Sequence, residues 1–270
     1  MQIIGMMSQV PGVGKQRRYV VTGAASGIGA ATRRWLEAAG HRVVGVDLRD
    51  AEVVADLSTP AGREGMVDGV RAEVGDALEG VLACAGVAGQ SGDPERIVKV
   101  NYFGAVATLE GLRPLLARGT APRAATIASI ALLRDPIDAV VEACLAGDEA
   151  TALANRGTDG HVAYTSSKRA LAKWVRRAAP TDAWAGAGIA LNVVGPGIID
   201  TPMAAYLVGT PELRAKTIME TPQPYGQVGQ ADHIASLLAW LTSAENGFVT
   251  GQVIFADGGF EAVTRGADWP

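Results

Sequence analysis

The stretch RYVVTGAASGIG, residues 18–29, runs from a short apolar segment directly into a glycine-rich turn. The apolar residues predict a buried strand, and residues 27–40 carry apolar side chains at helical spacing, with Gly40 as a stop signal. Such a turn between a strand and a helix lets backbone N–H groups approach a pyrophosphate at the helix N-terminus. The glycines could also serve packing alone, and the rest of the chain has to distinguish the two interpretations.

Short apolar runs alternate with longer amphipathic runs along the rest of the chain, the pattern of βα units around a parallel sheet. Strands are predicted at 18–23, 41–47, 51–57, 78–86, 124–133, 188–197 and 251–259, with helices at 27–40, 60–75, 94–119, 161–174 and 230–243. This order predicts an α/β protein with a single doubly wound Rossmann-like domain, in which helices cover both faces of a seven-stranded parallel sheet. We expect residues 1–17 to be a loose N-terminal leader, 18–270 the domain, and 134–160 an inserted helical segment before the helix of Tyr164.

The composition describes a compact protein with a large core, because 48% of its 270 residues are hydrophobic and only 19% are charged. A net charge of −4 argues against a nucleic-acid surface, which needs a concentrated basic patch. Two cysteines, Cys84 and Cys144, are too few for a disulfide framework, and the three histidines have no metal-ligand spacing. No apolar stretch is long enough to span a membrane and no signal peptide is evident, so a cytoplasmic location is expected.

An acidic residue, Asp47, ends the second predicted strand, 18 residues after Gly29. A carboxylate at that place accepts hydrogen bonds from the ribose hydroxyls of a bound dinucleotide and repels a 2′-phosphate. Ser26, not a basic residue, stands before Gly27, and Arg49 is the nearest group that could favour a 2′-phosphate. The sequence therefore predicts NAD as cofactor in preference to NADP.

The segment HVAYTSSKRALAKW, residues 161–174, places Tyr164 and Lys168 four positions apart. On a helix, residues at this spacing lie on one face, so a phenol and an ammonium can share a site. A phenol keeps its proton until about pH 10, and a neighbouring cation lowers that pKa. The pair could thus be a tuned proton donor and acceptor, although the same spacing also occurs by chance in helices.

The spacing Gly-x-x-x-Gly-x-Gly, followed by further motifs in order, resembles the short-chain dehydrogenase/reductase family over nearly the whole chain from Arg18. The further motifs are ADL (55–57), CAG (84–86), VNYFG (100–104), IASI (127–130), YTSSK (164–168) and GPGIIDTP (195–202). Cys84 departs from the family pattern, which usually has an asparagine there that braces the sheet.

The resemblance implies a role for each matched residue. The cofactor-binding set is Gly23, Ser26, Gly27, Ile28, Gly29, Asp47, Asp56, Leu57, Cys84, Ala85, Gly86, Tyr164, Lys168, Pro196, Gly197, Ile199 and Thr201. Tyr164 would be the general acid/base, Lys168 and the positive nicotinamide would lower its pKa, and Lys168 would also hold the nicotinamide ribose. Ser129 would stabilise charge on the substrate oxygen, and Asn101 would anchor a water that links Lys168 to solvent.

Residues 40–63 and VNYFGA (100–105) resemble the branch of bacterial 3α-hydroxysteroid dehydrogenase/carbonyl reductases, and the 35 residues from Ser129 to Tyr164 match an insertion in that branch. There the inserted helices imply a role in subunit contact, so a homodimer is expected, with a homotetramer as the alternative. Bacterial coniferyl alcohol dehydrogenases look similar over the same segments.

Residues 203–226 follow the last motif and are predicted to form a substrate lid, with Met203, Tyr206, Leu207 and Met219 as its apolar inner face. An ordinary amphipathic surface helix is the alternative. The expected activity is NAD-dependent interconversion of a bulky apolar secondary alcohol, such as a 3α-hydroxysteroid, and its ketone. An aromatic or terpenoid alcohol is the alternative substrate. A dinucleotide-sensing protein without turnover is the alternative class, although it would be expected to lack the serine, tyrosine or lysine.

Overall fold

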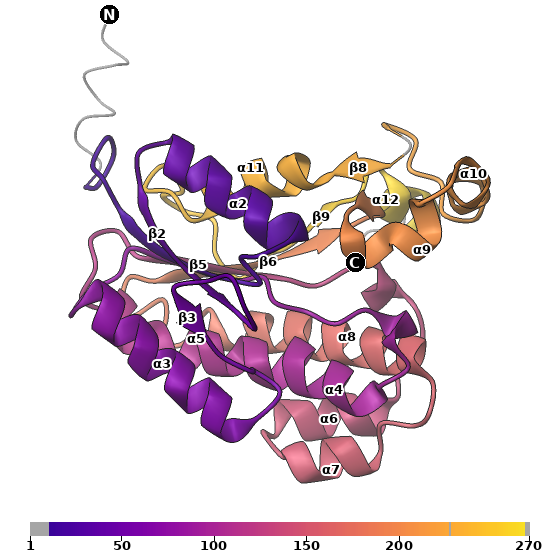
Figure 1. The fold of residues 1–270 in the computed structure, drawn as a ribbon, viewed down its shortest axis with the longest axis horizontal. Coiled ribbons are helices and arrows are strands. Elements are labelled where there is room, and N and C mark those ends of the chain that lie inside the picture. Colours follow the sequence, from indigo (N-terminus) through magenta and orange to yellow (C-terminus); the bar gives the residue numbers. More distant parts are fainter. Residues whose placement is uncertain (1–10, 227, 268–270) are drawn as a thin grey trace, which may run out of the picture.

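The computed structural model, which describes residues 11–226 and 228–267, has a parallel sheet between two layers of helices (Figure 1). Its strands are β1 (Arg18–Thr22), β2 (Arg42–Asp47), β3 (Val53–Val54), β4 (Gly80–Ala83), β5 (Arg123–Ile127), β6 (Ala190–Pro196) and β9 (Val253–Ala256). They lie in the order β3-β2-β1-β4-β5-β6-β9, with every neighbouring pair parallel. The direction of winding reverses between β1 and β4, and the predicted doubly wound sheet is confirmed.

Helices cover both faces of the sheet because its strands alternate apolar side chains between two cores. Above the sheet lie α2 (Gly27–Ala38) and α11 (Ala231–Leu241); below it lie α3 (Pro60–Val74), α4 (Pro94–Val98), α5 (Ala105–Leu116) and α8 (Gly160–Ala178) (Figure 1). In β1, Val20 packs into the lower core, whereas Tyr19 and Val21 pack into the upper core. This is the two-residue alternation of a strand that is buried on both sides.

The inserted segment forms two short helices, α6 (Asp138–Leu145) and α7 (Glu149–Ala154), which lie beneath α8 in Figure 1. Val140, Val141 and Cys144 are fully buried, so α6 extends the lower core. An ion pair of 2.8 Å between Arg63 of α3 and Glu149 ties α7 to the domain. The predicted helical insertion before α8 is confirmed.

Several element boundaries differ from the prediction. The fifth strand ends at Ile127, and residues predicted to continue it form a 3₁₀ helix, η3 (Ile130–Leu133), because the Ser129 side chain accepts a hydrogen bond from the Ala131 N–H and starts a turn. The long helix predicted over 94–119 contains a π-helical stretch, η2 (Lys99–Gly104), between α4 and α5. Such stretches often occur at functional sites.

Other elements were not predicted. They are a two-stranded sheet of β7 (Ile199–Asp200) and β8 (Gly229–Gln230), the 3₁₀ helices η1 (Gly89–Ser91) and η4 (Pro202–Ala204), and a final helix α12 (Phe260–Arg265). Strands β3, β4 and β9 are also shorter than expected, because their carboxyl ends turn into loops. None of the described helices is long and apolar enough to cross a membrane.

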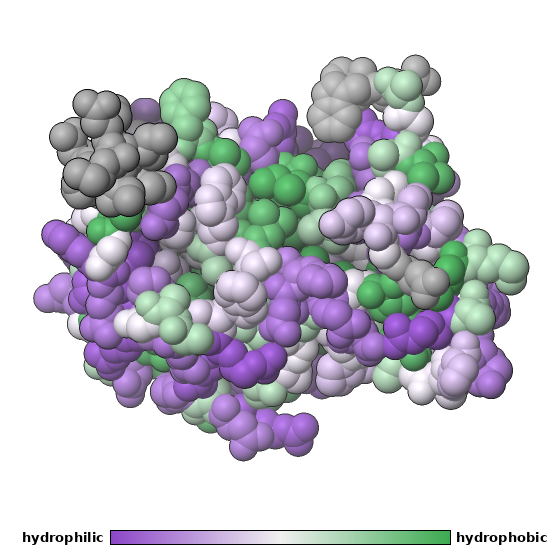
Figure 2. Space-filling view, turned by 90° about the horizontal axis from the view of Figure 1, so that it is seen from above, coloured by the Kyte–Doolittle hydropathy of each residue, from purple (hydrophilic) through white to green (hydrophobic). Residues whose placement is uncertain are grey.

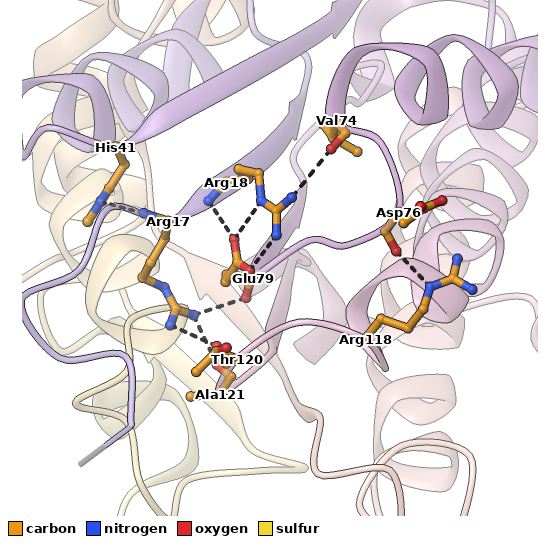
Figure 3. Close-up of polar contacts among 9 residues, drawn as sticks. All are labelled: Arg17, Arg18, His41, Val74, Asp76, Glu79, Arg118, Thr120 and Ala121. Carbon is orange, nitrogen blue, oxygen red and sulfur yellow. Dashed lines mark hydrogen bonds and ion pairs between the residues drawn. The ribbon is translucent and has the colours of Figure 1, made fainter. Parts of the chain in front are cut away.

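Arg17, which was predicted to belong to the loose leader, is held in the domain by hydrogen bonds. Residues 1–10 of that leader lie outside the described residues. The Arg17 side chain is only 3% exposed and donates to the carbonyls of Glu79 and Thr242 at 3.0 and 3.1 Å. Figure 3 shows it beside Arg18 and Glu79, where β1 and β4 begin. A buried guanidinium needs acceptors, and the backbone at the amino end of the sheet supplies them.

Candidate active site

A cavity of about 520 Å³ opens at the carboxyl ends of the strands, at the point where the strand order reverses. In open α/β sheets this is the usual place for a ligand. All of the predicted cofactor and substrate residues border it: Gly23, Ser26, Gly27, Ile28, Gly29, Asp47, Asp56, Leu57, Cys84, Ala85, Gly86, Tyr164, Lys168, Pro196, Gly197, Ile199, Thr201, Met203, Tyr206 and Leu207. Ser129 borders it too, whereas Asn101 does not.

The glycine-rich turn brings backbone close to backbone between β1 and α2. Gly23 has a φ of +69°, and a Cβ there would lie 2.9 Å from the Cα of Ala85. A Cβ on Gly29 would lie 2.1 Å from the Gly23 carbonyl oxygen, so any side chain would push α2 away from the turn. Ser26 makes no side-chain cap and the first turn of α2 has no acidic residue. The N–H groups at this helix end therefore remain available to an anion in the cavity.

Asp47 is held at the end of β2 by two backbone hydrogen bonds. Its carboxylate accepts from the N–H of Ala25 at 3.0 Å and from that of Leu48 at 2.7 Å. Nearby basic groups are engaged or lie elsewhere: Arg33 is paired with Glu52 at 2.6 Å and with Glu37 at 2.8 Å. The side chain of Arg49 is 86% exposed and does not border the cavity. The carboxylate therefore dominates the electrostatics of this edge.

Two further groups that border the cavity are the Asp56 carboxylate and the uncharged Cys84 thiol. A hydrogen bond from Ser58, assisted by the charge of Arg96, holds the pKa of Asp56 below its ordinary value. Burial raises the pKa of the Cys84 thiol to about 12, so it stays neutral. The next residue is braced without an asparagine at position 84, because the Ala85 N–H donates to the Thr22 hydroxyl at 3.0 Å.

Ser129, Tyr164 and Lys168 meet at the other end of the cavity. Tyr164 and Lys168 share one face of α8, with the ammonium 5.7 Å from the centre of the phenol ring. Lys168 is 4% exposed and donates to the Ile127 carbonyl at 2.8 Å, and burial lowers its pKa to about 8. These three groups can stabilise a substrate oxygen and move a proton to or from it.

The lowering of the Tyr164 pKa by Lys168 and a positive nicotinamide concerns the complex with cofactor and stays a prediction. In the protein alone, burial raises the pKa of Tyr164 above its ordinary value, and the hydrogen bond with Ser129 works in the opposite direction. Lys168 is itself desolvated and donates to a backbone carbonyl. Any further lowering needs a positive group in the cavity.

Asn101 lies outside the cavity, fully buried within η2. Its amide accepts from the Val87 N–H at 2.7 Å and donates to the Val87 carbonyl at 2.9 Å. The side chain is therefore occupied in holding the loop after Gly86. Asn101 is thus a positioning residue for that loop, and its role as the anchor of a water stays a prediction.

The predicted lid consists of η4, α9 (Ala205–Val208) and α10 (Pro211–Glu220). Met203, Tyr206 and Leu207 border the cavity as expected, but Met219 is 77% exposed, and Thr217 and Glu220 take the inner side of α10. Gln90 of η1 spans the opening and donates to the Met203 carbonyl at 3.1 Å. In the view from above, hydrophobic residues surface on the right, where α9 and α10 lie (Figure 2).

Sequence reasoning missed several cavity residues. They include Leu48, Arg96, Arg134, His161, Glu220 and Phe260. His161 could have been found, because it lies three residues before Tyr164 on the same helix face. Arg134 could not, because its segment was predicted to leave a strand and instead leaves η3. Among the described residues no cluster of His, Cys, Asp or Glu could hold a metal ion.

Comparison with known proteins shows that this chain is similar to dehydrogenases and reductases. Residues 150–261 match the family model described as Enoyl-(Acyl carrier protein) reductase. The chain is 39% identical to the 3-alpha-hydroxysteroid dehydrogenase/carbonyl reductase of Comamonas testosteroni, over 91% of this chain and 97% of the relative. It is 31% identical to cis-4-hydroxycyclohexanecarboxylate dehydrogenase of Sinomonas cyclohexanicum, over 92% of this chain and 98% of the relative.

Among solved structures, the 3-alpha-hydroxysteroid dehydrogenase of Pseudomonas sp. B-0831, complexed with NADH, superposes with a TM-score of 0.87 at 39% identity. The match covers 93% of this chain and 100% of the solved chain. The similarity therefore extends over both the sheet and the loops that form the cavity.

Proposed function

The chain belongs to the short-chain dehydrogenase/reductase family and is an oxidoreductase, and on that premise we propose that it interconverts a bulky apolar secondary alcohol and its ketone with NAD. One observation carries the proposal: Ser129, Tyr164 and Lys168 meet at one end of a cavity whose other end has the glycine-rich turn and Asp47. A dinucleotide fits such a cavity, with its pyrophosphate near Gly27–Gly29 and its adenosine ribose near Asp47. Bound NAD supplies the hydride acceptor.

The protein's own residues handle the proton. In alcohol oxidation, the Tyr164 oxygen takes the proton of the substrate hydroxyl, and in ketone reduction it returns one. The Ser129 hydroxyl donates a hydrogen bond to the substrate oxygen, whose negative charge grows during proton loss. Lys168, with its pKa near 8, places a proton-bearing group beside the phenol at a pH close to neutral.

NAD is favoured over NADP by the charges around the ribose edge. Asp47 would lie against a 2′-phosphate, while Arg33 is already paired with two carboxylates and Arg49 points to solvent. Placing like charges together in this way costs several kcal/mol.

The substrate class rests on the lid and on the relatives. Met203, Tyr206 and Leu207 give the cavity an apolar wall suited to a ring system. The names of the relatives specify a 3α-hydroxysteroid and a hydroxycyclohexanecarboxylate, which are both ring-bearing alcohols. A 3α-hydroxysteroid is therefore the first candidate.

The test is to mix the purified protein with androsterone, a 3α-hydroxysteroid, and either NAD or NADP, and to follow reduced-nicotinamide absorbance. We expect turnover with NAD that exceeds turnover with NADP by about 100-fold in kcat/KM. Turnover of coniferyl or terpenoid alcohols without turnover of androsterone would replace the substrate class. Tight NAD binding without turnover of any alcohol would favour a dinucleotide sensor instead.

The resemblance to the 3α-hydroxysteroid dehydrogenase branch supports a proposal for the oligomeric state, because it implies a role for the inserted helices in subunit contact. In this chain α6 packs against α8. A homodimer is the expected state, and light scattering of the purified protein distinguishes it from a tetramer.

A further inference from the structure

Hydrogen bonds hold the backbone of Arg134 at the end of η3. Its N–H donates to the Ala131 carbonyl at 3.0 Å. Arg169 of α8 donates to the carbonyls of Leu132 and Arg134 at 2.8 and 2.7 Å. This clamp joins the segment after Ser129 to the helix of Tyr164, so the position of Arg134 relative to both residues is set by the fold.

Arg134 is exposed and borders the same cavity as Tyr164 and Tyr206. Its charge acts on the Tyr206 hydroxyl, lowering a pKa that burial raises, and Tyr206 acts in turn on Tyr164. The ring of His161, one helical turn before Tyr164, lies 6.4 Å from that of Tyr206. Arg134, Tyr206 and His161 therefore surround the outer part of the substrate space.

Among the described residues, the positive charge of Arg134 has no carboxylate as ion-pair partner. Within residues 11–226 and 228–267, no carboxylate lies within ion-pair distance of its guanidinium. Glu220 also borders the cavity, but its carboxylate lies 3.8 Å from the Lys216 ammonium. The other cavity carboxylates, Asp47 and Asp56, lie at the adenosine end.

We propose that Arg134 binds a carboxylate at the far end of the alcohol substrate, so that the preferred substrates are bulky hydroxy acids and not neutral alcohols. The inference rests on the proposed function and specifies its substrate class. A 3₁₀ rise of about 2 Å per residue puts Arg134 about 10 Å along the chain from Ser129. A fused-ring alcohol can span that distance between its hydroxyl and an acid group. Arginine suits this role because its planar fork binds a carboxylate through two hydrogen bonds.

The test compares the 17β-carboxylic acid of androstan-3α-ol with its methyl ester, which differs only in charge at the far end. We expect the wild type to prefer the acid about tenfold or more in kcat/KM, mainly through KM, because the contact is the same in ground state and transition state. In Arg134→Gln the preference should fall to near unity, while androsterone turnover stays within about twofold. Arg134→Lys should keep part of the preference, and raised salt should weaken it.

Arg34→Gln is the matched control, since it removes one positive charge from the outer face of α2, where the side chain is 65% exposed. Equal turnover of acid and ester by the wild type, or an acid preference that survives in Arg134→Gln, would overturn the inference. If none of androsterone, the acid and its ester is turned over, the proposed function fails separately. Calorimetric binding of acid and ester to wild type and Arg134→Gln, with NAD present, then still decides whether Arg134 forms the anion site.

Discussion

At the amino end of the sheet, Arg17 and Arg18 each donate several hydrogen bonds to protein acceptors (Figure 3). At the carboxyl end, Lys168 is as buried as Arg17 but donates to one carbonyl. Arg18 and Glu79 form an ion pair of 2.9 Å, and the Glu79 carboxylate also accepts from the Arg18 N–H at 2.8 Å. The amino end is thus closed by charge-assisted contacts.

At the carboxyl end of the sheet, several polar groups around the cavity are not fully satisfied by the described part of the protein. Helix α2 starts without a side-chain cap, Lys168 has its pKa lowered to about 8, and Tyr164 has its pKa raised. The uncapped helix end and the lowered lysine pKa cost stability in the protein alone and become favourable only with a suitable ligand. Variants at the two ends should therefore differ in whether activity or stability changes.

The largest effect is expected for Tyr164→Phe, which removes the proton-transferring oxygen and leaves the ring. Oxidation of androsterone should fall about 10³-fold in kcat, with Tm and NADH binding nearly unchanged. Tyr225→Phe, at a side chain that is 96% exposed, is the control. Activity of Tyr164→Phe within tenfold of the wild type would mean that another group transfers the proton.

At the amino end, Arg17→Ala should leave several buried carbonyls without their donor. We expect the free energy of unfolding to fall by about 3 kcal/mol and Tm by about 6 °C, with kcat unchanged in the folded enzyme. Denaturant unfolding and thermal scans measure this, with Arg34→Ala as control. An unchanged Tm would show that the amino end does not carry this share of stability.

Lys168→Met tests the opposite expectation at the carboxyl end, without cofactor. The pKa of Lys168 is about 8 in the folded state and lies below the ordinary 10.5, so at pH 7 the folded state holds the lysine charge unfavourably. Between pH 8 and 10.5 the folded state has released this proton and the unfolded state still holds it. The variant should be more stable than the wild type by up to about 3 kcal/mol at pH 7, and inactive.

The stability advantage of Lys168→Met should shrink as pH rises through that window, because the wild type becomes more stable there. Lys173→Met, on the exposed side of α8, should show no such pH dependence. Unfolding curves at several pH values measure both variants. An advantage that is constant with pH would argue against a lowered lysine pKa.

Asp47→Ser should alter cofactor choice with little change in stability. Removal of the carboxylate weakens binding to the ribose hydroxyls and relieves repulsion of a 2′-phosphate, so we expect the NAD/NADP ratio of kcat/KM to fall about 100-fold. Steady-state kinetics with both cofactors provides the measurement. An unchanged NAD/NADP ratio would mean that residues other than Asp47 distinguish NAD from NADP.

The smallest effects concern the lid. Met203→Ser should raise KM for androsterone severalfold, because it removes apolar wall, while Met219→Ser should change it by less than about twofold. The two methionines differ in that Met203 borders the cavity and Met219 faces solvent. Equal effects would mean that the lid adopts another arrangement with substrate bound.

The family and the sheet could be predicted, and nearly all of the predicted site residues border the cavity, since the motifs follow strand ends and those ends converge in a parallel sheet. Met219 was placed wrongly, because the direction of a helical side chain depends on local winding, and the short α9–α10 connection changes it. Arg17 and Arg134 were missed because their partners come from distant segments.

The most direct measurement is backbone hydrogen exchange with and without saturating NAD. We expect NAD to slow exchange in the loops of the carboxyl end, residues 23–29, 84–88 and 196–208. The amino end, around residues 17–19 and 79–80, should stay slow and unchanged. Protection at the amino end, or no protection in the cavity loops of an enzyme that turns over NAD, would contradict this division between a ligand-binding end and a stabilising end.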